Sequence, residues 1–338
     1  MQREEQSGGD AGHQNAFGPQ SGSEKGVFGG VVDAVPEVGM KRAEPEVRVL
    51  VPGDEAVLEA FLMPHLASSM FLLGNVRAAG LTDTGERVSG TYVAAFEGGE
   101  MVGVVAHFWN GTLMPQVPAP WTGQYLDDLW RGAVRASGRQ AKGVIGPDDQ
   151  ACAIKAELGF PPEIVQMDQR EKLYVLELAE LMVPEALSSG QVTARHPTPA
   201  DLEALVRWRI GYETETLDAE DTPDYRANAR ASQRRIIADR TAWVLEADGV
   251  PVATTGFNAV LTEVVQVGGV YTPPENRSRG YARCAVAASL LDARESGATR
   301  AILFTGEQNI AAQRAYAALG FRQVDYFRLC LLREGAVV

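Results

Sequence analysis

The sequence predicts an α/β protein made of two similar domains in tandem, each a mixed, mostly antiparallel and twisted sheet with helices on both faces. At 338 residues the chain is longer than one typical compact domain. Its two halves also show the same signals in the same order, a β-hairpin and later a helix that ends in Leu-Gly-Phe. The two Leu-Gly-Phe landmarks, which begin at Leu158 and Leu319, lie about one domain length apart.

The hairpins are predicted from strand-like runs on either side of a two-residue turn that contains glycine. The turns Gly98-Gly99 and Asp248-Gly249 are typical of tight hairpins. In each half, the glycine of Leu-Gly-Phe stands where a helix C-cap needs a left-handed residue. The predicted strands are 91–96 and 101–109 in the first half, and 242–246 and 252–257 in the second.

The predicted domain boundaries follow from composition. Residues 1–45 are rich in Gly, Ser, Gln and Glu and have no hydrophobic periodicity, which predicts disorder. Met40 stands just before the ordered sequence, so a native start there, without residues 1–39, is a hypothesis that the mass of the protein would test. We expect a first domain at 46–183, a linker at 184–191 and a second domain at 192–338.

The second half alternates helices and strands. Pro199 and Asp201 are start signals for an opening helix at 201–210, which an acidic stretch at 212–224 follows. Two prolines stop the strand that ends at Thr272, because proline cannot donate hydrogen bonds to a sheet. The remaining predicted elements are helices at 226–238 and 281–296, a buried strand at 301–304, and a final helix and strand.

Composition and charge exclude several classes of function. Hydrophobic residues make up 45% and charged residues 22%, as in soluble globular proteins. The formal net charge of −13, from 44 acidic and 31 basic residues, repels phosphate backbones and anionic membranes. We therefore expect neither nucleic acid nor a membrane as a partner. An acidic surface is compatible with a cationic amine substrate, although most acidic surfaces only keep a protein in solution.

Cysteine usage and the start of the chain indicate a cytoplasmic protein. Cys152, Cys284 and Cys330 form no C-x-x-C pair, which argues against a disulfide framework or a zinc site, and we expect no metal. There is no uninterrupted apolar run of about 18 residues, so no transmembrane helix is expected. The first residues do not resemble a signal peptide.

A candidate phosphate-binding loop lies between a predicted strand end and a predicted helix start. Unpaired N–H groups and the positive end of the helix dipole favour a bound pyrophosphate at such a place. Glycine would let the backbone approach the phosphates, and arginines would add charge-assisted hydrogen bonds. By itself, a loop of this kind is more often plain surface. The loop consists of Arg277, Ser278, Arg279, Gly280, Tyr281 and Ala282.

The strand before this loop ends abruptly at its two prolines. If the strand parts from its neighbour there, its backbone groups become free to pair with an amide-containing ligand arm such as pantetheine. An ordinary strand end is the equally open alternative. The backbone groups concerned belong to Val270, Tyr271 and Thr272.

Two polar residues fall on one face of the predicted final helix. Asn309 is a natural N-cap, and Tyr316 follows two turns later. A phenol close to a thioester can protonate the departing thiolate, because its reference pKa of about 10 lies near that of a thiol. The alternative is that Tyr316 is a half-buried core residue.

In this order and spacing, the segments resemble the acetyl-CoA site of the GNAT superfamily of N-acetyltransferases. The family signature Q/R-x-x-G-x-G/A is matched by Arg277, Gly280 and Ala282, and the segment from Asn309 through Tyr316 resembles the family's second CoA-binding segment. The resemblance covers residues 190–338. The first half is similar to the N-terminal domain of two-domain members from a bacterial branch whose substrates are mostly unassigned.

The resemblance implies an acetyl-CoA-dependent N-acetyltransferase that passes the acetyl group directly to an amine. The N–H of Val270 would hold the thioester carbonyl and stabilise the oxyanion. Residues 278–282 would hold the pyrophosphate, Asn309 would fix the CoA arm, and Tyr316 would be the general acid. Acetyl-CoA would be the cosubstrate, and the acceptor would be an amine on a small molecule or a peptide.

The general base is unassigned. Many family members carry a Glu in the strand before the prolines, where this chain has Gly268 and Gly269. Glu215 in the acidic stretch and Glu307 at the end of the short strand are substitutes, but either is equally a solvated surface carboxylate.

The first half lacks the CoA-binding signals. Three prolines within 115–120 stand where a phosphate loop needs N–H donors. The counterparts of Asn309 and Tyr316 are Asp148 and Lys155. We expect this half to support the second domain, shape its acceptor cleft or form an oligomer contact such as a homodimer. The alternative function for the whole chain is a non-catalytic acyl-CoA-binding module, which would not need an acid such as Tyr316.

Overall fold

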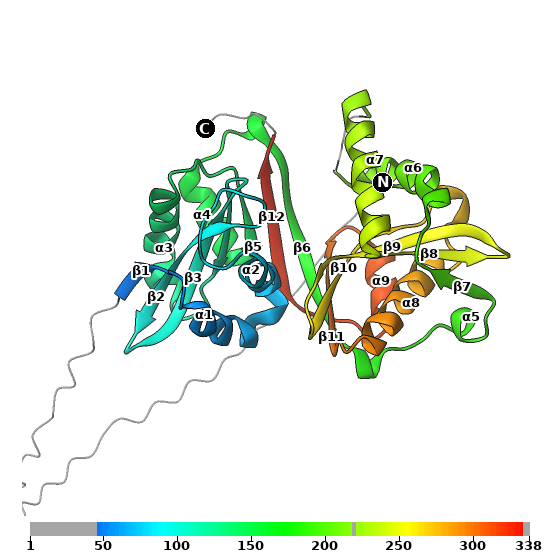
Figure 1. The fold of residues 1–338 in the computed structure, drawn as a ribbon, viewed down its shortest axis with the longest axis horizontal. Helices are drawn as coiled ribbons and strands as arrows, with labels where there is room; N and C mark the ends of the chain where they lie inside the picture. The colour runs from blue at the N-terminus through cyan, green and yellow to red at the C-terminus, as the bar shows by residue number, and fades with distance from the viewer. Residues whose placement is uncertain (1–45, 218–220, 334–338) are drawn as a thin grey trace, which may run out of the picture. The chain divides into compact units, whose positions relative to one another are not determined.

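The computed structural model describes residues 46–217 and 221–333 (Figure 1). The expectations for residues 1–45, disorder and a start at Met40, lie outside these ranges. The first half consists of β1 (Glu46–Val49), α1 (Glu55–Leu62), α2 (Leu66–Ala79), β2 (Gly90–Glu97), β3 (Glu100–Phe108), β4 (Thr112–Gln116), α3 (Thr122–Ser137), β5 (Gly143–Pro147), α4 (Asp148–Leu158) and β6 (Val165–Glu177). The second half consists of β7 (Val192–Arg195), α6 (Leu202–Leu217), α7 (Pro223–Asp239), β8 (Ala242–Ala247), β9 (Val250–Val260), β10 (Val264–Tyr271), α8 (Tyr281–Glu295), β11 (Arg300–Gly306), α9 (Ile310–Ala317) and β12 (Arg322–Leu332), and the short helix α5 (Glu185–Ser188) precedes it.

Both halves use the same order of elements: a strand, two helices, three strands, a helix, a strand, a helix and a last strand. The strands of the described residues form a 12-stranded sheet in the order β1-β2-β3-β4-β5-β12-β6-β11-β10-β9-β8-β7. Pairing is parallel between β4 and β5 and between β10 and β11, and antiparallel in the other described pairs. The predicted fold class, a tandem of mixed and mostly antiparallel α/β halves, is confirmed.

The predicted hairpins are also confirmed, as β2–β3 and β8–β9. All four turn residues, 98–99 and 248–249, have positive φ, the conformation that two-residue hairpins of this type require. Gly159 caps α4 in the left-handed conformation, as its place in Leu-Gly-Phe predicts. These features are local in sequence, which is why the residue pattern alone predicts them.

The opening helix of the second half is longer than predicted. It runs through Leu217, so the acidic stretch begins as helix rather than after it. An ion pair between Arg209 and Glu213, one turn apart, stabilises this extension. The next helix starts at Pro223, and the side chain of Thr222 accepts a hydrogen bond from the N–H of Tyr225 at 3.2 Å as its N-cap.

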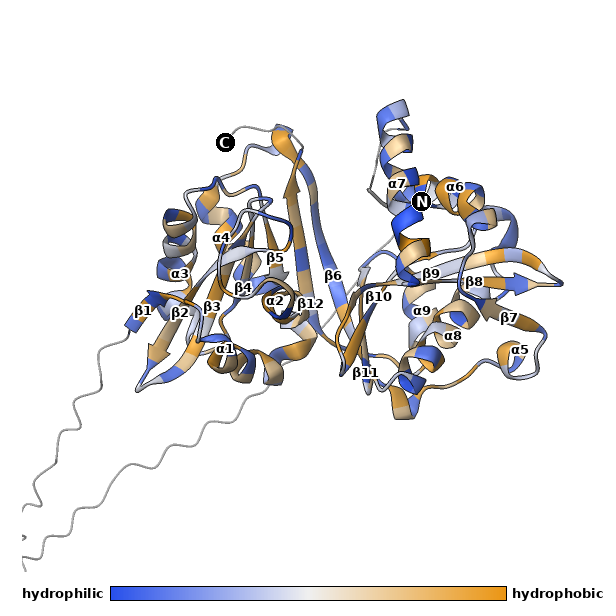
Figure 2. Ribbon diagram, in the orientation of Figure 1, coloured by the Kyte–Doolittle hydropathy of each residue, from blue (hydrophilic) through white to orange (hydrophobic). Residues whose placement is uncertain are grey.

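The two halves exchange their last strands. β6 follows α4 in the chain, yet it pairs with β11 and β12 of the second half. β12 in turn lies between β6 and β5, next to the sheet of the first half. The predicted linker at 184–191 therefore separates the halves along the chain but not within the sheet. Figure 2 shows that β6 carries hydrophilic residues along much of its length beside the more hydrophobic β12.

Helices cover both faces of the sheet because alternate residues of a strand point to opposite sides. In β2, Tyr92 and Ala94 enter the hydrophobic cluster under α1 and α2. Val93 and Ala95, between and beside them, enter the cluster under α3. In the second half, α8 packs on β8, β9 and β10. Helix α6 packs on β10 and contributes to a separate, small hydrophobic cluster.

One helical run, Glu55–Ala79, is long and apolar enough to pass the length and hydropathy test for a membrane span. It comprises α1, a 3-10 turn and α2, which explains why the sequence shows no uninterrupted apolar run. Its apolar residues pack in the core of the first half. They include Leu58, Leu62, Leu66, Met70, Leu72, Leu73 and Val76. This packing is that of the core helices of a globular fold.

An arginine–aspartate pair recurs at the same place in both halves. Arg48 donates two hydrogen bonds to Asp54, at 2.6 and 2.9 Å, and Arg195 donates two to Asp201, at 2.7 and 2.9 Å. The arginine hydrogen bonds lower the pKa of each carboxyl group to about 2. Each pair ties the first strand of a half to the start of its first helix, so it is part of the repeated scaffold.

Candidate functional site

The parallel strands β10 and β11 part in the middle of the sheet. Their register runs from Val264, opposite Arg300, to Val267, opposite Leu303, and stops there. A bulge follows in β10, where Gly269 has a φ of 60° and the pairing with β9 shifts between Gly268 and Tyr271. The strands therefore part at a glycine bulge, before the two prolines that the sequence suggested as the cause. Parted strands leave backbone groups free to bind a ligand.

Gly268 is required by a close neighbour. A Cβ atom at this position would lie 2.0 Å from Nδ2 of Asn258, which reaches over from β9. No carboxylate side chain fits on residue 268 while Asn258 stays in place. Asn258 thus occupies the space of the side chain that the family resemblance implies at this point of the strand.

A cavity of about 1130 Å³ opens between the parted strands. Its wall is formed by β10, the loop that follows, the starts of α8 and α9, the end of β11, and β6 from the first half. Of the predicted site residues, it is lined by Val270, Tyr271, Thr272, Arg277, Ser278, Gly280, Tyr281, Ala282, Asn309, Tyr316 and Glu215. Glu307 also lines it, whereas Arg279 is not among its lining residues.

The loop before α8 has the geometry of an anion-binding turn. Ser278 and Gly280 have positive φ values of 63° and 80°, with Arg279 between them, so successive N–H groups turn toward one side. Gly280 is the N-cap residue of α8, whose first N–H groups have no partner inside the helix. Arg283, which the sequence analysis did not single out, also lines the cavity, and its buried Nε has no hydrogen-bond partner among the described residues.

Arg277 and Glu215 form an ion pair at the mouth of this loop. The guanidinium donates to Oε2 of Glu215 at 2.6 Å and to the carbonyl of Thr272 at 3.0 Å. The hydroxyl of Tyr271 donates to the other oxygen of Glu215 at 3.0 Å. Burial, then the contact with Glu215, raises the pKa of Tyr271. Each carboxylate oxygen of Glu215 therefore accepts a hydrogen bond, and the guanidinium of Arg277 is bound to this carboxylate.

Asn309 and Tyr316 lie as the helix spacing predicts. The side chain of Asn309 accepts a hydrogen bond from the N–H of Ala312 at 3.1 Å, which confirms it as the N-cap of α9. Tyr316 is buried against Phe321, with ring centroids 5.9 Å apart, and lines the cavity. Burial raises the pKa of its phenol above the usual range, so the group is protonated at neutral pH.

Glu171 is a carboxylate of the site that the sequence analysis missed. It lies on β6, opposite Gly306 of β11 and Phe327 of β12, and it lines the cavity. Burial raises its pKa to about 7. A charged run, 168–172, in what proves to be an inner strand was the available signal, but its importance depends on the strand exchange.

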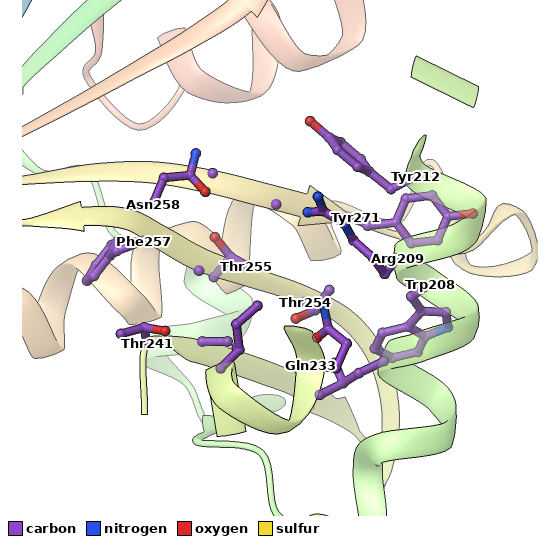
Figure 3. A pocket seen from close by; sticks show the side chains of 16 residues that line it. Trp208, Arg209, Tyr212, Gln233, Thr241, Thr254, Thr255, Phe257, Asn258 and Tyr271 are labelled. Carbon is purple, nitrogen blue, oxygen red and sulfur yellow. The ribbon is translucent and has the colours of Figure 1, made fainter. Parts of the chain in front are cut away.

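A smaller cavity of about 70 Å³ adjoins the large one and shares Tyr212, Gly268, Gly269 and Tyr271 with it. Figure 3 shows Trp208, Arg209 and Tyr212 projecting from α6, with Gln233, Thr254 and Thr255 nearby. The Thr255 hydroxyl is buried without a hydrogen-bond partner. Gly211 allows α6 to come close, because a Cβ there would lie 2.6 Å from the Tyr271 hydroxyl.

In the corresponding region of the first half, the polar groups are paired with one another and with Arg328 of β12. Asp148, the counterpart of Asn309, accepts a hydrogen bond from Arg328 at 2.8 Å. Lys155, the counterpart of Tyr316, is ion-paired with Asp168, which Arg328 also contacts at 2.6 Å. Just after β4, the N–H of Val117 donates to the side chain of Gln150 at 2.8 Å, so that backbone group is already satisfied.

The described residues include no group of three or more His, Cys, Asp or Glu side chains placed to hold a metal ion. The cavity is lined by Asn, Tyr, Arg and Glu side chains and by backbone groups. The Asn, Tyr and Arg side chains and the backbone N–H groups can donate hydrogen bonds to an anionic or amide-containing ligand.

Comparisons with known proteins agree with this geometry. Residues 202–321 match the model described as the acetyltransferase (GNAT) family. A search of curated proteins returned no match. Among solved structures, a GCN5-related N-acetyltransferase from Sphaerobacter thermophilus has a TM-score of 0.51 at 15% identity, over 87% of this chain and 98% of that one. A Drosophila protein has a TM-score of 0.59 at 12% identity, over 86% of this chain and 99% of that one.

At these identities the structural matches show the fold, and they extend it over both halves of the chain. The family match covers the half that contains the parted strands, the loop before α8 and the helix with Tyr316. The protein therefore has a tandem GNAT-like fold, and its residues 202–321 match the acetyltransferase (GNAT) family.

Proposed function

We propose that the protein is an N-acetyltransferase that moves an acetyl group from acetyl-CoA to a primary amine on a small molecule or a peptide. The family domain supports acyl-CoA-dependent acetyl transfer in general. One observation carries the finer proposal: a single cavity of about 1130 Å³ is lined by the parted strands, the loop before α8 and Tyr316. One cavity would thereby bind both the pantetheine arm and the pyrophosphate, and it would also contain the proton donor.

Donor binding would use backbone groups first. The N–H of Val270 lies in the bulge, where neither Gly269 nor Val270 has a register partner on β9, and it would hold the thioester carbonyl and then the oxyanion. Residues 278–282 would hold the pyrophosphate through N–H groups at the start of α8. Arg283 would add a charged donor, because its buried Nε has no other partner. Asn309 would fix the CoA arm beside Tyr316.

Tyr316 would be the general acid. Its burial keeps it protonated until a thiolate develops beside it, so it donates a proton rather than accepting one. A thiolate in the same buried site also gains proton affinity, because burial disfavours any charged form. The two proton affinities therefore stay close enough for transfer.

The acceptor would enter through the smaller cavity beside α6. Trp208 and Tyr212 offer flat apolar surfaces, and Gln233 and Thr255 offer hydrogen bonds inside the same space. The shared wall at Tyr271 and Gly268 brings an acceptor held there to the bulge of β10.

Several further expectations belong to the same proposal. With a first half at 46–183 and an acyltransferase half at 192–338, the proposed CoA-binding loop and Tyr316 belong to the second half, and β6 of the first half adds to the cavity wall. The acidic charge of the chain favours neither nucleic acid nor a membrane as partner and suits a cationic amine. A cytoplasmic location fits a chain with three free cysteines. A homodimer formed through the first half remains part of this proposal.

A thiol-release assay with acetyl-CoA and a panel of amines tests the function. We expect acetyl-CoA to bind in calorimetry and at least one amine to accelerate thiol release. Binding without thiol release from any amine would instead support the non-catalytic acyl-CoA-binding module. No binding of acetyl-CoA would contradict both functions.

A further inference from the structure

Three positions were candidates for the general base. The carboxylates at two of them, Glu215 and Glu307, already bind other side chains, and the third, position 268, has no room for a carboxylate while Asn258 stays in place. Both oxygens of Glu215 are held, by Arg277 and by Tyr271. Glu307 is ion-paired with Arg170 at 3.5 Å on the solvent side of the cavity, where its side chain is 35% exposed. A carboxylate at position 268 is excluded by Asn258.

We infer that Glu171 is the general base, so that the first half supplies a catalytic residue to the active site of the second half. This inference rests on the proposed acetyltransferase function. It follows from the exchange of strands, because β6 belongs to the first half along the chain and lies beside β11 in the sheet. The cavity wall includes Glu171 together with Val270 and Tyr316, the residues proposed to hold the oxyanion and to donate the proton.

The surroundings of Glu171 suit proton abstraction. Its carboxylate makes no hydrogen bond or ion pair within residues 46–217 and 221–333, so it is available to a ligand. Burial raises its pKa to about 7, where it is still ionised in a large share of molecules at neutral pH and binds a proton well. Its negative charge also contributes to the raised pKa of Tyr316, which keeps the acid and the base distinct.

Charged and titratable groups from each neighbouring element face the same cavity. From β12, the residue opposite Glu171 is the apolar Phe327. The others are Tyr316 and Arg314 on α9, Tyr212 and Glu215 on α6, Tyr271 on β10, Arg277, Tyr281 and Arg283 around the start of α8, Glu307 after β11, and Arg170 on β6. Burial, and no single partner among these groups, is the cause of the raised pKa of Glu171.

In the reaction, Glu171 takes one proton from the acceptor ammonium, which leaves a neutral amine with a free electron pair. That pair forms the C–N bond to the thioester carbonyl carbon, and the C–S bond breaks as the carbonyl re-forms. Tyr316 gives its proton to the departing thiolate, and the nitrogen returns a proton to the phenolate, directly or through water. Glu171 then releases its proton to solvent, so one turnover yields one amide, one CoA thiol and one proton.

The test is the pH profile of thiol release for wild type and Glu171→Gln. We expect wild-type kcat/KM to rise through an acid limb near pH 7 as Glu171 ionises. Glu171→Gln should lower kcat at neutral pH by roughly 10²-fold or more. In the pH profile of this variant, the acid limb near pH 7 should be replaced by a limb at the pKa of the acceptor amine. High pH should therefore partly restore the rate. The affinity for acetyl-CoA should stay unchanged. A changed affinity would instead indicate that Glu171 has a merely structural role.

Glu177→Gln is the matched control. Glu177 is on the same strand, and its ion pair with Arg300 at 2.7 Å is exposed, so this variant should keep the wild-type profile. If Glu171→Gln does not fold, as judged by circular dichroism, Glu171→Asp replaces it and should be slower but keep the acid limb.

The outcomes separate the two proposals. A wild type that is active, with a Glu171→Gln variant of unchanged rate and profile, overturns the inference alone. An Asp variant without the acid limb also contradicts it. A wild type that binds acetyl-CoA and releases no thiol with any amine overturns the proposed function, and the inference with it.

Discussion

In the first half, the parallel strands β4 and β5 stay close together beyond their last paired residues. In the second half, the gap between the parallel strands β10 and β11 opens into a cavity. A Cβ at Gly146 of β5 would lie 2.9 Å from Pro115 of β4, so these strands pack directly on each other. In β10, Gly268 and Gly269 form a bulge beside the cavity instead. The order of elements is the same in both halves, so the proposed difference in ligand binding depends on a few residues at this gap.

The scaffold and the site have therefore diverged separately. The pairs Arg48–Asp54 and Arg195–Asp201 are repeated with the same spacing, because each half still needs its first helix fixed to its first strand. At the position of Tyr316, the first half has Lys155, which is ion-paired with Asp168. The first half nevertheless contributes a strand to the sheet of the second half, because β6 pairs with β11.

The comparison is tested most strongly by counting sites. Because Val117 N–H is already bonded to Gln150 and Asp168 is already bonded to Arg328 of β12, calorimetry should find one acetyl-CoA bound per chain. A stoichiometry of two would show that both gaps bind the cosubstrate. Lys155→Ala, which removes a partner of Asp168, is expected to leave the stoichiometry at one.

The next largest effect concerns the acid that distinguishes the halves. Tyr316→Phe removes the phenol but keeps the ring packed on Phe321, so turnover should fall by roughly 10²-fold or more with little change in acetyl-CoA affinity. Steady-state kinetics and calorimetry measure these two quantities. Equal turnover of the variant and the wild type would remove Tyr316 as the acid.

The shared scaffold is tested by Asp54→Ala and Asp201→Ala. Each removes a carboxylate that accepts two arginine hydrogen bonds, and each should lower the free energy of unfolding by about 1–2 kcal/mol, since the arginines are about a third exposed. The stabilisation comes from a lowered pKa, so it is complete above the unfolded pKa of about 4 and is lost as the pH falls toward 2. Denaturant titrations of wild type and variants at pH 7 and at pH 2.5 measure it. A difference that persists in full at low pH contradicts the ion-pair explanation.

The smallest effect is expected for Glu215→Gln. Its carboxylate is engaged by Arg277 and Tyr271, and it is exposed at the cavity mouth, so kcat should change less than about threefold. A fall as large as that expected for Glu171→Gln would make Glu215 the base, as the sequence analysis allowed. The same thiol-release assay decides between them.

Much of the second half could be predicted because its signals are local. The start of α8 at Tyr281, the N-cap at Asn309 and the position of Tyr316 two turns later depend on residues close together in the chain. Helix caps and tight turns are set by neighbouring residues, so the residue pattern alone indicates them.

Only the tertiary structure decided which residues from distant parts of the chain share the site. The sequence placed Glu215 over the cavity but not in its ion pair with Arg277, and it explained the parting of β10 from β11 by prolines rather than by the bulge at Gly269. The charged run around Glu171 does not by itself indicate a site, because the proposed role of Glu171 arises only when β6 pairs with β11 of the other half. Strand pairing joins residues that are far apart in sequence, and the exchange of last strands is what turns a charged run in the first half into part of the cavity of the second.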